Sequence, residues 1–395
     1  MPANLGNRLR DVRKRRGMTQ KELARESGVS LSLIRKLEQG ERHETRLETT
    51  RRLATILRVS TTRLVAEPVE DGASDAVVDE WEPVRKALTA PVQEPSELDE
   101  APTLEGVRDA LADVVRLYSA DRYTELVAVL PALLRDADAL APLDPAGRAL
   151  RADLLHFAGR TMIHTRQFEA AEWALESALE ASTSHLQSAA TADMICWLLM
   201  RQGKLGQARE LAEQWAIRTE PRMSRATPDE LTTWGWLLLR WSAAAVRDNR
   251  PNEADDSLRL AHAAAVAMGR PFTPGDDAQR TFGPGTVRLK RIENAAVMDR
   301  PDVVLRLSEE IPANRLGGLP ASTDRNRHLL DVADALTKTR QYGPAIGTLM
   351  TIRNDASQWL PHQRYARHIL GTIVDHRRTL TGEMRSLADT VGLPV

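Results

Sequence analysis

Cysteine and long apolar runs are both scarce in this 395-residue chain. Its one cysteine, Cys196, excludes an intramolecular disulfide and a cysteine-rich zinc site, and it favours the reducing cytoplasm as the location. The least polar stretch, residues 231–246, is interrupted by Arg240 and is shorter than the ~20 apolar residues of a membrane helix. The first 17 residues alternate apolar and charged side chains, where a signal peptide would have an apolar centre. We therefore expect a cytoplasmic protein without a membrane role.

Aromatic residues make up only 4% of the chain, but eight of them are tryptophans. Trp197, Trp234, Trp236 and Trp241 lie in stretches with a helical pattern. Large apolar rings in such stretches are typical of the space between packed helices. We expect most of these tryptophans to fill that space.

Signatures of catalysis are absent as well. The chain has no GxxxxGK[ST] loop, no HExxH pair and no GxSxG turn. The glycines of FGPGTVRLKR, residues 282–291, lack the spacing of a phosphate-binding loop. His156 and His164 share a helical face but have no third ligand in register, so packing is the preferred explanation. We predict no enzyme, catalytic residue, metal site or cofactor.

Charge is distributed very unevenly, although the net charge is only −1. Residues 1–65 hold 16 Lys and Arg against 7 Asp and Glu, a net charge of +9. Residues 66–105 hold 2 against 12, a net charge of −10, and the remainder is neutral. We predict three parts: a nucleic-acid-binding head over residues 1–66, an acidic linker over 67–103 and a neutral body over 104–395.

The head begins with the pattern of two short helices. Apolar residues recur at i, i+4 and i+7 over residues 5–16, which predicts an amphipathic helix. Thr19 with Glu22 three positions later has the pattern of a capping box. It predicts a second helix over residues 20–27.

A glycine separates the second helix from a third. Gly28 allows a sharp turn with positive φ, and Ser30 then caps a helix that continues to Gln39 before Gly40. Further helices are predicted over residues 47–57 and 61–65. This order resembles the phage-repressor-type (xenobiotic-response-element type) helix-turn-helix family across residues 5–65, which implies a five-helix DNA-binding domain.

The resemblance implies that the exposed face of the third helix enters the major groove. With Ile34 and Leu37 buried, that face carries Leu31, Ser32 and Arg35. An arginine can pair bidentately with guanine, a serine can bond to several bases, and a leucine can pack on a thymine methyl group. These three side chains are the candidates for base contacts.

A second set of residues is expected to contact phosphates. By resemblance, Gln20 and Gln39 lie beside the DNA backbone, and cations add sequence-independent attraction. These cations are Lys21, Lys36, Arg42 and the run at residues 13–16. Their alternative role is simply to solvate a small helical bundle.

The linker contains one stretch with a different pattern. Residues 66–101 are acidic and rich in proline, which is typical of a solvated connector. Within it, Trp81, Val84 and Leu88 recur at helical spacing. They predict a short helix over residues 80–88 that docks on a neighbour.

The body is predicted to be a helical repeat. A cassette recurs six times, with an apolar helical stretch before and after each copy. The cassettes are DRYTEL (121–126), RQFEAA (166–171), GKLGQA (203–208), NRPNEA (249–254), DRPDVV (299–304) and RQYGPA (340–345). We predict six helix pairs followed by a helical cap over residues 364–387.

Small residues in the second pair have tetratricopeptide spacing: Ala171 follows Gly159 by twelve positions, and Ala178 follows by seven more. The body therefore resembles a tetratricopeptide array, although the intervals between cassettes all exceed the ~34 residues of that family. The whole layout resembles the tetratricopeptide-containing regulators of actinobacteria. The predicted fold class is all-α, a repressor-type head and a tetratricopeptide-like α-solenoid.

A solenoid has a concave face that usually binds a partner. The inner face of the first helix of each pair is predicted to carry arginines and tryptophans. The predicted residues are Arg160, Trp197, Arg201, Trp236, Arg240, Arg247, Lys290 and Asp334, with Arg327 at a helix start. Such a wall could hold a peptide or an anionic metabolite, or its cations could simply pair with neighbouring acids.

The sequence thus favours a transcriptional regulator that binds a double-stranded DNA operator. Its solenoid is expected to form a homodimer and to sense a peptide, small molecule or protein partner. One alternative is a constitutive repressor with a purely structural solenoid. Another is a protein-interaction scaffold or antitoxin-like protein that binds DNA only for autoregulation.

Overall fold

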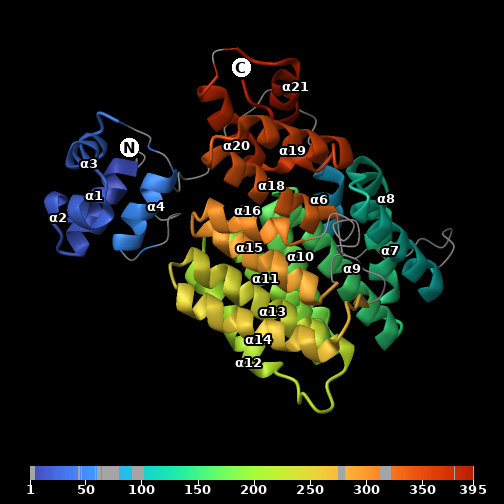
Figure 1. The fold of residues 1–395 in the computed structure, drawn as a ribbon. Helices are drawn as coiled ribbons and strands as arrows, with labels where there is room; N and C mark the ends of the chain where they lie inside the picture. The colour runs from blue at the N-terminus through green and yellow to red at the C-terminus, as the bar shows by residue number, and fades with distance from the viewer. Residues whose placement is uncertain are drawn as a thin grey trace.

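The protein is described here by a computed structural model of the 395-residue chain. The structure describes residues 5–42, 45, 47–57, 59, 64, 80–90, 102–274, 281–311, 322–377 and 379–394. Within these residues the fold is all-α, with an N-terminal head beside a larger helical body (Figure 1). The described part has no β-strand, only an isolated antiparallel bridge between Phe272 and Phe282.

The head contains four described helices. They are α1 (Leu5–Arg15), α2 (Gln20–Ser27), α3 (Leu31–Glu38) and α4 (Leu47–Ile56). The predicted capping box at Thr19 and the predicted cap at Ser30 are both confirmed. Gly28 has a φ of 67° and makes the turn between α2 and α3. The helix-turn-helix predicted from the sequence is present, with the predicted boundaries of α2.

The core of the head is purely aliphatic, and it holds the helices together. Leu9, Leu23, Ile34, Leu37 and Leu53 are all fully buried in one cluster. The fifth helix predicted over residues 61–65 lies outside the described residues, apart from position 64. Its leucine is buried in the same cluster. Through this core α3 packs against α1 and α2, and α4 packs against α2.

A short helix from the predicted linker belongs to the core of the body. Helix α6 (Glu82–Thr89) packs on α8 and α10. The three predicted contacts, Trp81, Val84 and Leu88, are all buried there. The Trp81 ring meets the Tyr123 ring edge-on with 6.2 Å between centroids. The prediction of a docked helix is confirmed.

Six antiparallel helix pairs form the solenoid, as predicted. The pairs are α7 (Leu104–Ser119) with α8 (Tyr123–Leu140), α9 (Pro145–His164) with α10 (Phe168–Ala181), α11 (His185–Arg201) with α12 (Leu205–Arg218), α13 (Pro228–Arg247) with α14 (Pro251–Met268), α15 (Pro284–Val297) with α16 (Pro301–Glu309), and α18 (Ser322–Lys338) with α19 (Tyr342–Asp355). The chain ends with η3 (Leu360–His362), α20 (Arg364–Asp375) and α21 (Gly382–Val391).

Each cassette marks the turn inside a pair. The first residue of every cassette has positive φ, from 55° to 77°, and the second helix begins two residues later. These residues are Asp121, Arg166, Gly203, Asn249, Asp299 and Arg340. A shared left-handed residue explains why one short motif recurs although the pairs differ in length.

The second pair confirms the close approach predicted at Gly159. A Cβ atom at this position would lie 2.6 Å from the Leu175 side chain. Ala171 and Ala178 are fully buried on the facing helix. Small residues therefore let α9 and α10 pack closely.

The solenoid curls until its two ends touch. One hydrophobic cluster includes residues of α6–α10 and of α18–α21, and these groups lie side by side in Figure 1. The Tyr123 and His362 rings lie edge-on with 5.9 Å between centroids. The Thr124 backbone N–H donates to Gln358 at 3.3 Å. The concave face is consequently turned inward.

Among the described helices, none combines the length and the apolar character needed to cross a bilayer.

Candidate functional site

The first candidate site is the outer face of α3. Ser32, Arg35 and Lys36 are exposed on it, while Ile34 and Leu37 face the core. This division follows the 3.6-residue period of the helix and matches the prediction. The face presents one arginine fork, one hydroxyl and one ammonium group to solvent.

The other predicted DNA contacts surround this face. Lys21, Gln39 and Arg42 are exposed, and Leu31 is half-buried at the first position of α3. Lys21 lies at the start of α2, and Gln39 and Arg42 follow the end of α3. This combination suits a surface in which phosphate contacts set the register and base contacts specify the sequence.

The role predicted for Arg13 is wrong. It was expected to belong to a phosphate-attracting run, but its side chain is only 10% exposed and forms an ion pair with Glu38. Arg13 Nε and Nη2 each donate to Glu38 at 2.7 Å, and Nη1 donates to the Met18 carbonyl at 2.7 Å. The periodicity of α1 puts this position on the inner face, beside the buried Val12.

Gln20 also takes part in this network. Its Nε2 donates to Glu38 Oε2 at 2.7 Å, so the side chain that was predicted to contact a phosphate has a partner inside the head. Arg13, Gln20 and Glu38 come from α1, α2 and α3. The network therefore ties the helix-turn-helix to the first helix and fixes the orientation of α3.

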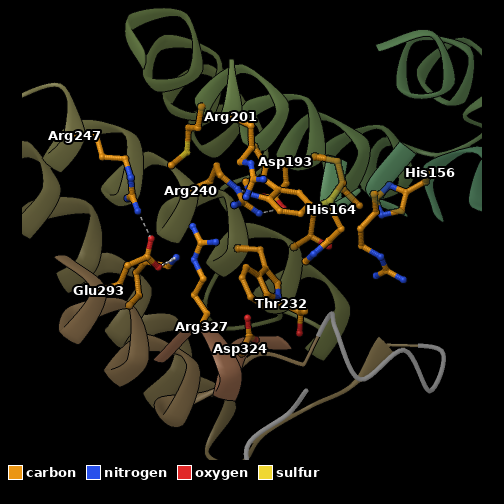
Figure 2. Close-up of a pocket in the computed structure, with 18 of the residues that line it drawn as sticks. His156, His164, Asp193, Arg201, Thr232, Arg240, Arg247, Glu293, Asp324 and Arg327 are labelled. Carbon is orange, nitrogen blue, oxygen red and sulfur yellow. Dashed lines mark hydrogen bonds and ion pairs between the residues drawn. The ribbon is translucent and has the colours of Figure 1, made fainter. Parts of the chain in front are cut away.

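The second candidate site is a cavity of about 170 Å³ in the body. It is lined mainly by the first helices of the pairs, α9, α11, α13, α15 and α18 (Figure 2). All eight residues predicted as a ligand-binding wall lie on it: Arg160, Trp197, Arg201, Trp236, Arg240, Arg247, Lys290 and Arg327. Asp334 does not line the cavity; it pairs with Lys338 at 2.8 Å.

Half of the cavity's basic residues are paired with acids. Arg240 Nε and Nη2 donate to the two oxygens of Asp193 at 2.9 and 3.0 Å. Arg247 and Lys290 both pair with Glu293. Burial alone would raise the pKa of Glu293, but these cations lower it well below its usual range. For Arg240, Arg247 and Lys290, the alternative prediction therefore holds: these cations pair with neighbouring acids.

Arg201 and Arg327 differ from them. Across the described part of the chain, neither side chain forms an ion pair or a side-chain hydrogen bond. The Arg201, Arg240 and Arg327 side chains converge on the middle of the cavity (Figure 2). Burial and repulsion from Arg327 lower the pKa of Arg201 to about 9. The guanidinium keeps its charge at neutral pH, but at a free-energy cost.

Aromatic rings form the rest of the wall. Trp197, Trp236 and Trp359 all line the cavity. The Trp197 ring meets the His164 ring at 4.6 Å between centroids and lies 5.7 Å from the Arg240 guanidinium carbon. Burial and nearby arginines lower the pKa of His164 well below its usual range, so the ring is neutral. The cavity thus combines cations with flat apolar surfaces.

Some residues that line the cavity were not predicted from the sequence. Asp193 precedes Trp197 by four positions and Glu293 follows Lys290 by three, so helical spacing could have identified both. Trp359 could not be identified in this way. It follows α19 in a turn, and it reaches the cavity because the solenoid closes on itself.

His156 and His164 both line the cavity. His156 Nδ1 lies 3.4 Å from the Thr191 hydroxyl. In the described ranges, no group of three or more His, Cys, Asp or Glu side chains is placed to hold a metal ion.

Residues 4–67 match a family model described as "Helix-turn-helix domain". The match covers the head and not the body. No curated protein matches the chain. The match supports a DNA-binding regulator and agrees with the helix-turn-helix geometry of α2 and α3.

Proposed function

We propose that the protein is a sequence-specific, double-stranded-DNA-binding transcriptional regulator that acts in the cytoplasm as a homodimer. The observation that carries the proposal is the helix-turn-helix of residues 4–67 with Ser32 and Arg35 exposed on α3. A helix with one exposed arginine and one hydroxyl can enter the major groove and read base edges there. The +9 charge of residues 1–65 supplies attraction to phosphates.

Arg35 and Lys36 have different roles in this proposal. Arg35 reads a base, whereas Lys36 contributes mainly to phosphate attraction. Arg35→Ala is expected to cost roughly 1–3 kcal/mol on the operator and to relax sequence preference. Lys36→Ala is expected to weaken binding on operator and random DNA alike and to flatten the salt dependence.

Genome-wide mapping of bound DNA would first provide the operator, and band shifts at several salt concentrations would then compare the variants. The wild-type chain on random DNA of equal length is the control. Equal losses on operator and random DNA for Arg35→Ala would remove its base-reading role. A stable stoichiometric complex with one other protein, together with binding only at the protein's own promoter, would favour the scaffold or antitoxin-like alternative.

The body, in this proposal, is a tetratricopeptide-like array that pairs two chains and senses a ligand, as in the actinobacterial regulators that the sequence resembles. The support for sensing is the convergence of eight predicted residues on one cavity. Ligand binding would change how the two bodies pair and therefore the distance between the two heads. That distance must match the ~34 Å between successive major-groove faces.

A fusion tests the sensing role. The head joined to an unrelated dimerisation module is expected to bind the operator but to lose the cellular response to changing conditions. If this fusion restores the full response, the body is a structural dimeriser and the sensing part of the proposal fails. The DNA-binding part is unaffected by that result.

A further inference from the structure

The cavity wall contains more unmatched polar groups than the two arginines. Thr232 and Trp359 are each 1% exposed, and their Oγ1 and Nε1 atoms have no hydrogen-bond partner within the described part of the chain. Both side chains line the cavity. Leaving a buried donor unpaired costs about 1–3 kcal/mol. Asp324 Oδ2, on the same cavity, also has no hydrogen-bond partner among the described residues. Three such polar groups on one small cavity are a feature that packing alone does not favour.

The charge of the wall is also unbalanced. Six Lys and Arg side chains line the cavity against three Asp and Glu. Asp193 and Glu293 are already occupied by Arg240, Arg247 and Lys290. The third acid is Asp324, and burial raises its pKa, which favours its neutral form. Among the described residues neither Arg201 nor Arg327 forms an ion pair, although the charge of Arg327 also acts on the Glu293 carboxylate that Arg247 and Lys290 already hold.

The unmatched groups have a common chemistry. The arginines, the indole N–H and the threonine hydroxyl can all donate hydrogen bonds, and so can the Asp324 carboxyl in the neutral form that its raised pKa favours. The arginines also carry positive charge. A complementary ligand must present several acceptor oxygens and negative charge. Guanidinium groups match planar carboxylates and phosphates especially well because two parallel N–H···O bonds can form.

The size of the cavity and its apolar wall restrict the class of ligand further. The cavity, at about 170 Å³, is below the ~300–1,000 Å³ typical of pockets for drug-sized ligands. A cavity of this volume favours a compact ligand over a folded partner or a long peptide. The flat rings of Trp197 and Trp236 suit a planar apolar group beside the anionic group.

We propose that the cavity binds a compact organic anion, a carboxylate or phosphate joined to a planar apolar group, through Arg201, Arg327 and Thr232. This inference rests on the proposed sensing function and names its ligand class. Without the anion, the two unmatched guanidinium groups destabilise the body. When the anion is bound, it neutralises the two guanidinium groups and the solenoid becomes more stable. Trp359, on the cavity wall, is adjacent in sequence to Gln358, which contacts Thr124 where the two ends of the solenoid meet.

The test uses the full-length chain and thermal unfolding followed by tryptophan fluorescence. The probes are benzoate and phenyl phosphate, with benzamide as the neutral match, inorganic phosphate as the anion without an apolar group, and an apolar tetrapeptide with a free C-terminal carboxylate. The two aromatic anions are expected to raise the Tm at millimolar concentration. Benzamide, inorganic phosphate and the tetrapeptide are expected to have little effect.

Three variants locate the site. Arg201→Met and Arg327→Met are expected to weaken binding of the aromatic anions about 10- to 100-fold, because each removes hydrogen bonds to a charged group. Thr232→Val removes one neutral donor and is expected to weaken binding about 3- to 10-fold. Arg367→Gln is the matched control, because Arg367 is exposed on α20, and it is expected to bind like the wild type.

The same variants give a readout that needs no ligand. Arg201→Met and Arg327→Met remove partly buried charge that has no ion-pair partner among the described residues, so the free variants are expected to have a Tm about 2–4 °C higher than the wild type. Each of four results would overturn the proposal. They are a lower Tm in both arginine variants, binding of benzamide as tight as that of the aromatic anions, tight binding of the tetrapeptide, and no rise in Tm with either aromatic anion. Band shifts with and without the anion distinguish the anion site from the sensing function. If the anion binds but the affinity for DNA does not change, the sensing function is excluded and the anion site remains supported.

Discussion

At the scale of single residues, the head and the body differ in whether charge away from solvent is paired. Glu38 accepts hydrogen bonds from Arg13 and Gln20, so its charge is neutralised inside the head. In the body, Arg201 has no ion-pair partner among the described residues. Buried charge is costly unless it is paired. The first arrangement stabilises one orientation of helices, and the second is suited to a ligand.

The ion pair between Arg13 and Glu38 gives a stability prediction. Arg13→Met leaves the Glu38 carboxylate buried beside a single amide donor, and it is expected to destabilise the head by roughly 3–5 kcal/mol. The head contains no aromatic residue, so hydrogen exchange over residues 5–42 of the full-length chain is the suitable measurement. The double variant Arg13→Met/Glu38→Leu should recover most of the loss. An unchanged exchange rate in the single variant would contradict a structural role for Arg13.

Asp331 gives a pH prediction. Burial, and repulsion from Glu293, raise the pKa of Asp331 from 3.8 to about 7, while Arg327 and Arg247 act in the opposite direction. The folded state therefore binds the Asp331 proton more tightly than the unfolded chain does. This contribution to stability is complete below about pH 4 and is lost as the pH rises through about 7.

Asp331→Asn is accordingly expected to flatten the fall in the free energy of unfolding between pH 5 and pH 8. Urea unfolding followed by tryptophan fluorescence at the two pH values measures it. Asp389→Asn, at an exposed position of α21, is the control and should keep the wild-type pH dependence. If both variants keep it, another group is responsible for the fall.

At the scale of elements, short local signals determine where helices begin and how they turn. The same left-handed residue opens every cassette, from Asp121 to Arg340. Helical periodicity can identify a helix even where composition indicates a linker. The apolar residues of α6 recur at helical spacing within an acidic, proline-rich stretch. That face is buried against α8 and α10. Helix α6 therefore contributes to the stability of the body.

The contribution of α6 can be measured. Leu88 is 1% exposed in the main cluster, so Leu88→Ala leaves a cavity and is expected to cost about 2–5 kcal/mol. Lys86, whose side chain is 75% exposed on the same helix, is the matched position, and Lys86→Ala should change stability by less than about 0.5 kcal/mol. Denaturant unfolding of the full-length chain compares the two. Equal effects would mean that α6 docks without stabilising the body.

At the scale of the whole molecule, the solenoid is curled so that its first and last helices meet. Contacts between Tyr123 and His362 and between Thr124 and Gln358 close it. Trp359, next to Gln358 in the chain, lines the cavity on the concave face. The head lies to one side of this body (Figure 1), and the Asn249 side chain, in the turn between α13 and α14, donates to the Val59 carbonyl. Head and body are thus in contact at the start of the fourth cassette.

The proposed homodimer determines how the chain covers its operator. One head covers a single half-site, which is seldom sufficient for specific affinity, and a two-fold operator requires a two-fold protein. Light scattering is expected to give the mass of a dimer for the full-length chain and of a monomer for residues 1–70. Footprinting should show two protected half-sites about 34 Å apart or a multiple of it. A monomeric full-length protein that protects one half-site would contradict the homodimer.

The local features were readable from the sequence because they depend on neighbours along the chain. Capping at Thr19, the glycine turn at Gly28 and the cassettes each depend on a few consecutive residues. Helical periodicity then assigned the inner and outer faces, which is why all eight candidate cavity residues line one cavity. The sequence by itself determined the helices, their pairing and the chemistry of their faces.

Only the tertiary structure decided which charges are paired and whether the solenoid is open. The partner of Arg13 lies 25 residues away and that of Arg240 lies 47 away, and no local pattern relates them. The small angle between successive helix pairs accumulates along the array, so a sequence that predicts each pair does not predict that Trp359 reaches the cavity. Long-range geometry sums many small local rotations, and periodicity carries no information about that sum.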